Sequence, residues 1–316
     1  MGNDHNVPQG QHFINRGLQP TGIDHRLQPT EISYGLQPTA RIGIDLGGTN
    51  VRMGIVENGK VVKKLAEPCK ANEPEEVVIN QLKEMISQLI HPDIESIGIG
   101  VPSIVNTEKG IVYDVANIPS WKKVYLKTIL EEEFHVPVTV NNDCNCFALG
   151  EYYFGAGAAY KNLVCITLGT GVGSGIIIDG RLYMGNNTGA GEVGSIPYLD
   201  HDYEYYCGSR FFSEEYGITG EEAYKRNCAG DKQALNLWNE VGVHIGNLLK
   251  VVLFTYDPET IILGGSISNA FPFFSGKTNE TLKTFPYPKT IEKVTIQVSQ
   301  KEDIALLGAS MLYKAN

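Results

Sequence analysis

Two stretches of this chain share one plan, and that repetition constrains the fold more than any other feature. The first, Arg41–Gly59, reads as an apolar strand ending in Asp45, a Gly-Gly-Thr turn, a second strand and an Asn-Gly turn. The second, Leu163–Gly180, reads as a strand, a Gly-Thr-Gly turn, a strand and an Asp-Gly turn. Asn-Gly and Asp-Gly are the strongest short hairpin signals, because both turn residues need φ > 0. The sequence therefore predicts two matched hairpins.

The turns inside the two stretches have a composition that suits phosphate binding. Glycine bares backbone N–H groups, which can then point at phosphate oxygens. One such loop is more often a plain structural turn, but aligning Gly48-Thr49 with Gly169-Thr170 also brings Gly59 and Gly180 to the same offset. Neither loop has the Gly-Lys-Ser/Thr of a Walker A sequence, and neither opens directly into a helix as a dinucleotide fingerprint does. We interpret the pair as a hairpin-type clamp for one polyphosphate.

The composition is that of a soluble globular protein, and it argues against several classes. The 316 residues, 42% hydrophobic and 20% charged, are enough for two domains. The net charge of −10 argues against a nucleic-acid partner, which would call for a basic face. We find no run of about 18 apolar residues and no signal-peptide core, so we expect no membrane partner. The six scattered cysteines fit reduced thiols in a cytoplasmic protein.

Residues 1–40 differ from the rest of the chain. Leu-Gln-Pro-Thr begins at Leu18, Leu27 and Leu36, with few apolar residues between the copies. Structural repeats usually need about 20 or more residues per unit, so these copies are too short to build a layer. We interpret the segment as a disordered tail, with a docking peptide as the alternative. It is also too short and too rich in proline to form a helix-turn-helix.

From Arg41 onward, predicted strands and helices alternate. Apolar residues recur at helical spacing in 73–90 and 231–256, whereas 96–101 and 260–263 are short apolar runs typical of buried strands. Such alternation predicts a mixed α/β protein in which helices flank sheets.

Asp143 is the candidate catalytic residue. It follows a predicted strand and precedes a predicted helix, where α/β proteins place reactive groups. Asp143 could instead cap that helix, as could Asn145. The neighbouring amide of Asn142 suits a sugar hydroxyl, because it can both donate and accept.

Five motifs follow one another in a set order. They are DLGGT (Asp45–Thr49), NNDCNCFALGE (Asn141–Glu151), TLGTGVGSG (Thr167–Gly175), GAGEVGS (Gly189–Ser195) and DPETIILGGS (Asp257–Ser266). This order resembles that of the ROK group of sugar kinases and repressors, which belong to the actin-like ATPase superfamily. The resemblance covers residues 41–316. It implies two actin-like (ribonuclease H-like) domains with an interdomain cleft: 41–143, on which a helix within 303–316 packs, and 144–302.

The resemblance further implies an ATP-dependent hexose kinase, most commonly one converting glucose to glucose 6-phosphate, and a homodimer. In such an enzyme a carboxylate accepts the hydroxyl proton, and the family pattern assigns this role to Asp143. Residues expected to bind ATP and Mg²⁺ are Asp45, Gly47, Gly48, Thr49, Thr170, Gly171, Gly264, Gly265 and Ser266, with Asp45 reaching Mg²⁺ through water. Residues expected at the sugar are Asn117, Asn142, Glu192, Ser195 and Glu214.

The chain departs from the family at the zinc motif. The family commonly continues from Glu-x-Gly-His into Cys-x-Cys-Gly-x-x-Gly-Cys-x-Glu, and the His and three Cys bind a structural zinc. Here Ser195 stands at the His position, and Tyr205, Cys207 and Phe212 stand at the three Cys positions. A closed structural zinc site needs four ligands, and one thiolate remains. We therefore expect no zinc, with aromatic packing in its place.

Two alternatives to a glucokinase stay open. One is a sugar-sensing regulator without kinase activity; the other is a kinase for another hexose, such as N-acetylmannosamine, allose or fructose. Repressors of the family carry a helix-turn-helix before the kinase-like part, whereas only the Pro-rich segment precedes Arg41 here, which favours the enzyme. Ser103, where relatives often have Gly, and the missing His leave the hexose open.

Overall fold

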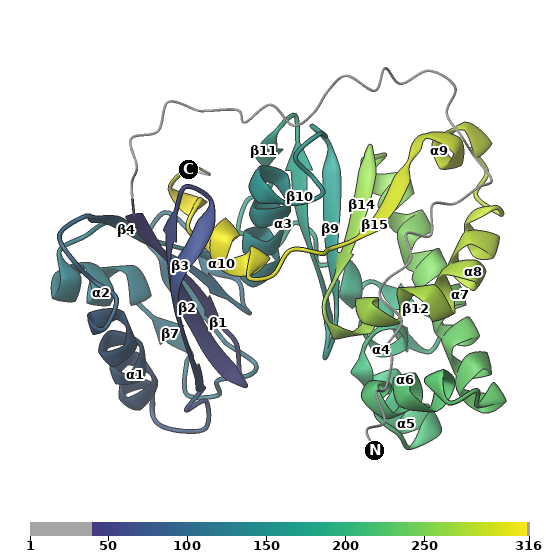
Figure 1. Ribbon diagram of the computed structural model, residues 1–316, viewed down its shortest axis with the longest axis horizontal. Coiled ribbons are helices and arrows are strands. Elements are labelled where there is room, and N and C mark those ends of the chain that lie inside the picture. The colour runs from purple at the N-terminus through teal and green to yellow at the C-terminus, as the bar shows by residue number, and fades with distance from the viewer. Residues whose placement is uncertain (1–39, 315–316) are drawn as a thin grey trace, which may run out of the picture. The chain divides into compact units, whose positions relative to one another are not determined.

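The computed structural model describes residues 40–314, and two five-stranded sheets of one topology organise them. The first has the strand order β3-β2-β1-β4-β8, and the second has the order β11-β10-β9-β14-β15. In each sheet three strands run as an antiparallel meander, and two further strands join in parallel. The repeated plan seen in the sequence thus extends to whole sheets (Figure 1).

The first sheet carries helices on both faces. Its strands are β1 (Ala40–Leu46), β2 (Asn50–Glu57), β3 (Lys60–Pro68), β4 (Ile94–Val101) and β8 (Val138–Asn142). Helices α1 (Glu75–Ser87) and α2 (Leu126–Phe134) flank one face (Figure 1). A small sheet of β5 (Val105–Asn106), β6 (Ile111–Tyr113) and β7 (Lys123–Val124) follows β4.

The second sheet is accompanied by helices of different lengths, the longest of which has 25 residues. Its strands are β9 (Leu163–Leu168), β10 (Val172–Ile178), β11 (Arg181–Leu182), β14 (Thr260–Gly264) and β15 (Thr295–Val298). The helices after β11 are α4 (Tyr203–Cys207), α5 (Ser209–Tyr216), α6 (Gly220–Cys228), α7 (Lys232–Tyr256), α8 (Phe271–Leu282) and α9 (Pro288–Lys293). Short elements between them are η1 (Val193–Ser195), β12 (Pro197–Tyr198), β13 (His201–Asp202) and η2 (Ser266–Ala270).

The two predicted hairpins are confirmed at the level of backbone angles. Asn58 and Gly59 join β2 to β3 with φ of 50° and 72°, and Asp179 and Gly180 join β10 to β11 with φ of 50° and 74°. Both turns therefore have two successive residues in the left-handed region, as type I′ hairpins require. The mixed α/β class and the helix predicted over 231–256 are confirmed as well, the helix beginning at Lys232.

Helix α3 (Asp143–Phe154) packs against both sheets, and helix α10 (Ile304–Ala309) packs against the first sheet and against α3. The contact is so close that a Cβ on Gly308 would lie 1.7 Å from the carbonyl oxygen of Cys146. Helix α10 also packs on β1, where a Cβ on Gly43 would lie 2.0 Å from the carbonyl oxygen of Leu306. Helix α3 contacts β4 of one sheet and β10 of the other. Domain boundaries at 143 and 302 stay a prediction.

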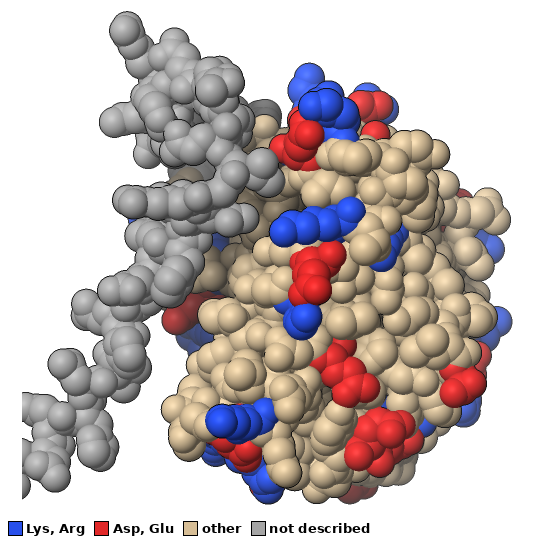
Figure 2. Space-filling model, turned by 90° about the vertical axis from the view of Figure 1, so that its right-hand side faces the viewer, with Lys and Arg blue, Asp and Glu red and all other residues tan. Residues whose placement is uncertain are grey.

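The surface of the described residues mixes both charges. Figure 2 shows acidic and basic side chains interspersed over one face. Within residues 40–314, none of the helices has the length and apolar character needed to cross a membrane. The predicted tail, apart from Ala40, lies outside the described residues.

Candidate active site

Asp143 is the first residue of α3, directly after β8. The side chain of Asn142 caps the helix, because its Oδ1 accepts hydrogen bonds from the backbone N–H groups of Cys144 at 2.8 Å and Asn145 at 3.3 Å. Asn142, rather than Asp143 or Asn145, is therefore the N-cap. Oδ1 of Asp143 also accepts from the N–H of Cys144, at 2.9 Å. The carboxylate of Asp143 also interacts with the thiol of Cys144 and with its own backbone N–H.

The environment of Asp143 changes its proton affinity. Burial, and after it the negative charge of Asp45, raises the pKa of Asp143 to about 6. The hydrogen bonds at the start of α3 act in the opposite direction. A carboxylate with this pKa is mostly ionised at neutral pH and accepts a proton more readily than an ordinary aspartate. Asp143 is thus suited to serve as a general base.

Asp45 lies near the end of β1, at the entrance of the first glycine loop. Its side chain is 14% exposed and forms an ion pair with Arg52 on β2, the residue opposite it in the strand register. Burial raises the pKa of Asp45, and Arg52 opposes this effect. Mg²⁺ in phosphoryl-transfer sites keeps several waters and needs one or two carboxylates besides the substrate phosphates. The carboxylate of Asp45, which lies close enough to Asp143 to raise the pKa of Asp143, fits that requirement.

The first glycine loop, Gly47-Gly48-Thr49, is held at both ends by the backbone. The N–H of Gly47 donates to the carbonyl of Asn50, and the N–H of Cys69 donates to the carbonyl of Thr49, each at 2.9 Å. A Cβ on Gly48 would lie 2.4 Å from Cβ of Asn117. Asn117, predicted as a sugar contact, therefore lies directly beside this loop.

The second glycine loop, Gly169-Thr170-Gly171, joins β9 to β10 in the same way. The turn after β14 packs against it, because a Cβ on Gly265 would lie 2.3 Å from the carbonyl oxygen of Leu168. Gly265 has φ of 82°, a conformation that side chains rarely adopt. Ser266 follows Gly265, and its Oγ lies 3.9 Å from the position that a Cβ on Gly169 would occupy. The fold thus brings together the two segments predicted to bind the nucleotide.

Helix α3 connects Asp143 to both sheets. A Cβ on Gly100, near the end of β4, would lie 3.3 Å from Cα of Asp143. On the other side, Sγ of Cys144 lies 3.3 Å from Oγ1 of Thr167, on β9 just before the second glycine loop. The predicted base is therefore held where the loop-bearing ends of the two sheets approach each other.

The remaining predicted sugar contacts have different surroundings. Glu192 is exposed and precedes η1; partial burial of its carboxylate, and then the charge of Glu204, raises the pKa of Glu192. Its charge also contributes to the raised pKa of Cys144, beside Asp143. Ser195 is exposed at the end of η1. Glu214 accepts a hydrogen bond from Nε of Arg210 at 3.0 Å, one helical turn earlier on α5.

The segment that replaces the zinc motif is packed with aromatic rings. Tyr205 stacks on His201 with ring centroids 3.9 Å apart, and Phe212 lies against Trp238 at 5.0 Å. Cys207 is fully buried, and burial raises the pKa of its thiol. Among residues 40–314, we find no group of three His, Cys, Asp or Glu side chains placed to hold a metal. Aromatic packing here is confirmed, and the metal content stays a prediction.

Sequence patterns do not indicate the role of Glu204. Its Oε2 accepts a hydrogen bond from the backbone N–H of Val172 at 3.0 Å, at the end of the second glycine loop. A Cβ on Gly171 would lie 2.5 Å from the same oxygen. Helix α4 is therefore attached to this loop through a side chain in the degenerate zinc segment.

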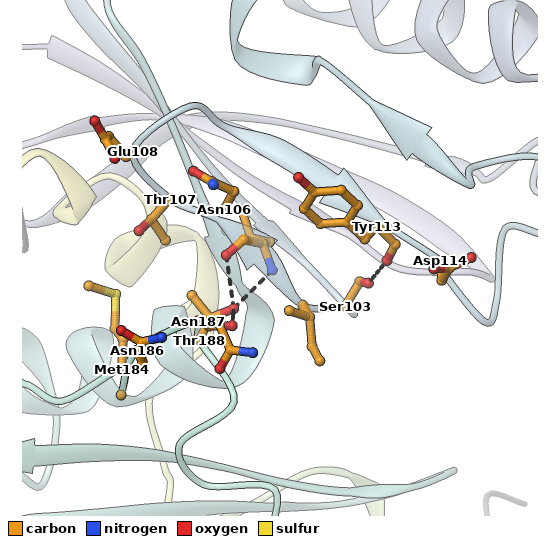
Figure 3. Close-up of a pocket in the computed structure, with 13 residues that line it drawn as sticks. Ser103, Asn106, Thr107, Glu108, Tyr113, Asp114, Met184, Asn186, Asn187 and Thr188 are labelled. Carbon is orange, nitrogen blue, oxygen red and sulfur yellow. Dashed lines mark hydrogen bonds between the residues drawn. The ribbon is translucent and has the colours of Figure 1, made fainter.

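Sequence patterns also do not indicate a pocket beside the candidate site. It has a volume of about 600 Å³ and is formed by two segments, 103–114 and 184–188 (Figure 3). Nδ2 of Asn142 donates to the carbonyl of Ser103 at 3.3 Å, and Nδ2 of Asn141 lies 3.0 Å from Sδ of Met184. Both pocket segments thus touch the two residues that precede Asp143. Consecutive asparagines, Asn186 and Asn187, are the one sequence signal that could have indicated it.

Two sheets of one topology, each with a glycine loop in its first hairpin, define an actin-like α/β protein. The chain belongs to the ROK family, whose family model matches residues 41–316. It is similar to the glucokinase of Thermotoga maritima, with 29% identity over 86% of this chain and 96% of the relative. The beta-glucoside kinase of Listeria monocytogenes is 28% identical over 84% of this chain and 94% of the relative.

A solved structure agrees with this assignment. The crystal structure of a ROK family glucokinase from Streptomyces griseus in complex with glucose and AMPPNP is 26% identical, with a TM-score of 0.74. It covers 86% of this chain, and this chain covers 98% of it. The resemblance predicted from five motifs is confirmed, and so is the actin-like fold.

Proposed function

We propose that this protein is an ATP-dependent sugar kinase that phosphorylates a hexose hydroxyl, with glucose as the first substrate to test. The observation that carries the proposal is the position of Asp143, a buried carboxylate with a pKa raised to about 6 between two glycine loops. A polyphosphate clamp and a tuned general base are the two parts that phosphoryl transfer to an alcohol requires. Related glucokinases, one of them solved with glucose and AMPPNP, support the same reaction.

In the proposed reaction, Asp143 accepts the proton of the attacking hydroxyl. The hydroxyl oxygen forms a bond to the γ-phosphorus, the bond between that phosphorus and the oxygen of ADP breaks, and ADP leaves. The backbone N–H groups of Gly48, Thr49, Thr170 and Gly171 orient the phosphates, while Gly47 and Gly169 shape the two loops. Bound Mg²⁺ would neutralise phosphate charge, with Asp45 holding it through water. Gly264, Gly265 and Ser266 would lie by the nucleotide.

The sugar would contact residues on both sides of Asp143. We assign Asn117 and Asn142 to the side of the first glycine loop, and Glu192, Ser195 and Glu214 to the opposite side. Asn142 has one amide hydrogen left for a sugar hydroxyl, because its Oδ1 caps α3 and its Nδ2 donates one bond to Ser103. We further propose a cytoplasmic homodimer that holds no zinc.

A coupled ADP-release assay over glucose, N-acetylmannosamine, allose and fructose tests the proposal. We expect ATP-dependent turnover of at least one hexose, and loss of that turnover in Asp143→Asn. A matched thermal-shift titration measures sugar binding separately. Sugar binding without turnover of any hexose would instead favour the sugar-sensing regulator.

A further inference from the structure

The second glycine loop is held from one side by residues 204–209, which we call the α4–α5 corner because α4 ends and α5 begins there. The N–H of Ser209 donates to the carbonyl of Gly169 at 2.9 Å, and Oγ of Ser209 donates to the carbonyl of Thr170 at 3.3 Å. Oε2 of Glu204 accepts a hydrogen bond from the N–H of Val172 at 3.0 Å. The corner therefore binds the backbone on both sides of the middle of the loop.

These contacts set the direction of two N–H groups in the loop. A trans peptide places its carbonyl and its N–H on opposite sides. The N–H of Thr170 therefore points away from the corner, which holds the carbonyl of Gly169, and the N–H of Gly171 points away from it for the same reason. Among residues 40–314, neither N–H has an acceptor. Two consecutive N–H groups are thus available to one phosphate.

Glycine allows the corner and the loop to approach each other closely. A Cβ on Gly171 would lie 2.5 Å from Oε2 of Glu204, and a Cβ on Gly208 would lie 3.0 Å from the carbonyl oxygen of Thr170. Neither distance leaves room for a side chain. Glu204 itself is exposed, so its hydrogen bond can be removed without leaving a cavity in the core.

Aromatic rings fix the corner from its other side. The ring of Tyr206 lies 4.7 Å from that of His244, and the ring of Phe212 lies 5.0 Å from that of Trp238. His244 and Trp238 both belong to α7, and Cys207, at the end of α4, is fully buried. The position of the corner therefore depends on the ring packing that stands in place of the family's zinc motif.

We propose that Glu204 is a positioning residue for the nucleotide, which holds the second glycine loop so that the N–H groups of Thr170 and Gly171 bind phosphate oxygens. The inference rests on the proposed sugar kinase function and adds a residue that touches neither ATP nor the sugar. Its contribution is preorganisation, because a loop that is already held loses little conformational freedom when the phosphates bind. Without this hydrogen bond, ordering the loop would weaken nucleotide binding.

The hydrogen bond of Glu204, and not its charge, is the feature that the loop requires. The phosphates of ATP are negative, so a carboxylate beside Gly171 repels them. The N–H of Val172 needs only an oxygen acceptor, which the amide of glutamine also supplies. Glu204→Gln therefore separates the two effects, and this variant should bind nucleotide at least as tightly as the wild type.

Separate measurements of nucleotide and sugar affinity test the inference. Calorimetric titration of the full-length protein with AMPPNP and Mg²⁺ would give Kd for the wild type, Glu204→Ala and Glu204→Gln. Glu221→Ala is the matched control, because Glu221 is an exposed glutamate on the neighbouring helix α6. We expect Kd to rise about tenfold in Glu204→Ala, as for one lost hydrogen bond to a charged group, and to keep its wild-type value in the control.

Two further measurements distinguish positioning from a general loss of structure. KM for the best hexose of the panel above should be unchanged in Glu204→Ala, whereas KM for ATP should rise. Ser209→Ala is a milder variant that loses only the bond to the carbonyl of Thr170, and its Kd for AMPPNP should rise about threefold. Urea denaturation without ligands verifies that each variant is folded.

The possible results separate the two proposals. An unchanged Kd for AMPPNP in Glu204→Ala would overturn the positioning role and leave the kinase function standing. An equal rise in Glu204→Ala and Glu204→Gln would assign the effect to charge, and equal losses of nucleotide and hexose affinity would assign it to the fold; either result overturns the positioning role. AMPPNP binding that depends on Glu204, without turnover of any hexose, would refute the kinase function alone.

Discussion

The hydroxyl of Thr188 lies 2.9 Å from the backbone nitrogen of Val105 and 3.0 Å from the backbone oxygen of the same residue. The two residues are 83 positions apart, and their contact joins the segment after β11 to β5. Thr188 has φ of 58°, a conformation that β-branched residues rarely adopt. The hydrogen bonds with Val105 thus hold Thr188 in a backbone conformation that is unfavourable for a threonine.

Replacing Thr188 should destabilise the fold through Val105. In Thr188→Ala, the buried N–H and carbonyl of Val105 lose their partner, so we expect the free energy of unfolding to fall by about 1–3 kcal/mol. Thr188→Ser keeps the hydroxyl and is the matched control, expected to retain most of the stability. Urea denaturation of the three proteins measures the difference. Equal stability of the Ala and Ser variants would show that the hydroxyl contributes nothing.

Asp143→Asn should lower activity and raise stability. Loss of the general base should reduce kcat by roughly 10²-fold or more. The same change removes a carboxylate that burial disfavours, so the free energy of unfolding at pH 7 should rise by up to about 3 kcal/mol, since one pKa unit corresponds to about 1.4 kcal/mol. Turnover assays and urea denaturation measure the two effects. A lower free energy of unfolding for Asp143→Asn would show that the ionised carboxylate of Asp143 makes stabilising interactions that outweigh the cost of its burial.

The pH dependence should follow the raised pKa of Asp143. Activity requires the ionised form, so kcat/KM should increase with pH and level off above about 6. Stability should change in the opposite direction: between the unfolded pKa of 3.8 and about 6, the folded state binds more protons at Asp143, so its contribution to stability declines as pH rises. The difference in unfolding free energy between wild type and Asp143→Asn, measured from pH 4 to 7, isolates this residue. A pH-independent difference would contradict the assignment.

Removal of metal should leave the fold unchanged. Tyr205 and Phe212 stand at two of the family's zinc-ligand positions and pack against other rings, and Cys207 alone cannot hold a closed tetrahedral ion. We expect no stoichiometric zinc by elemental analysis, and no change in the melting temperature with a strong chelator, because no folding energy depends on the metal. Activity lost to the chelator should return fully with Mg²⁺. About one zinc per chain would refute this prediction.

The local sequence determined the hairpins and the long helices. Asn58-Gly59 and Asp179-Gly180 dictate their turns because few other residue pairs accept two successive positive φ angles. The apolar residues at helical spacing in α7 likewise predict the length of this helix from the local sequence. Asp231 is its N-cap. The glycine loops lie in the same two stretches as these hairpins, so the sequence alone predicted the position of the proposed polyphosphate clamp.

The tertiary structure alone decided how the candidate site is assembled. The sequence left Asp143 and Asn145 as possible caps, but packing of β8 against β4 positions Asn142 to cap α3. Glu204 reaches Val172, 32 residues away, and Thr188 reaches Val105 across a longer separation. No local pattern encodes such contacts, because they depend on how two sheets and the helices between them pack. The pocket between 103–114 and 184–188 exists only through that packing, whereas the two hairpin turns follow from their own residues.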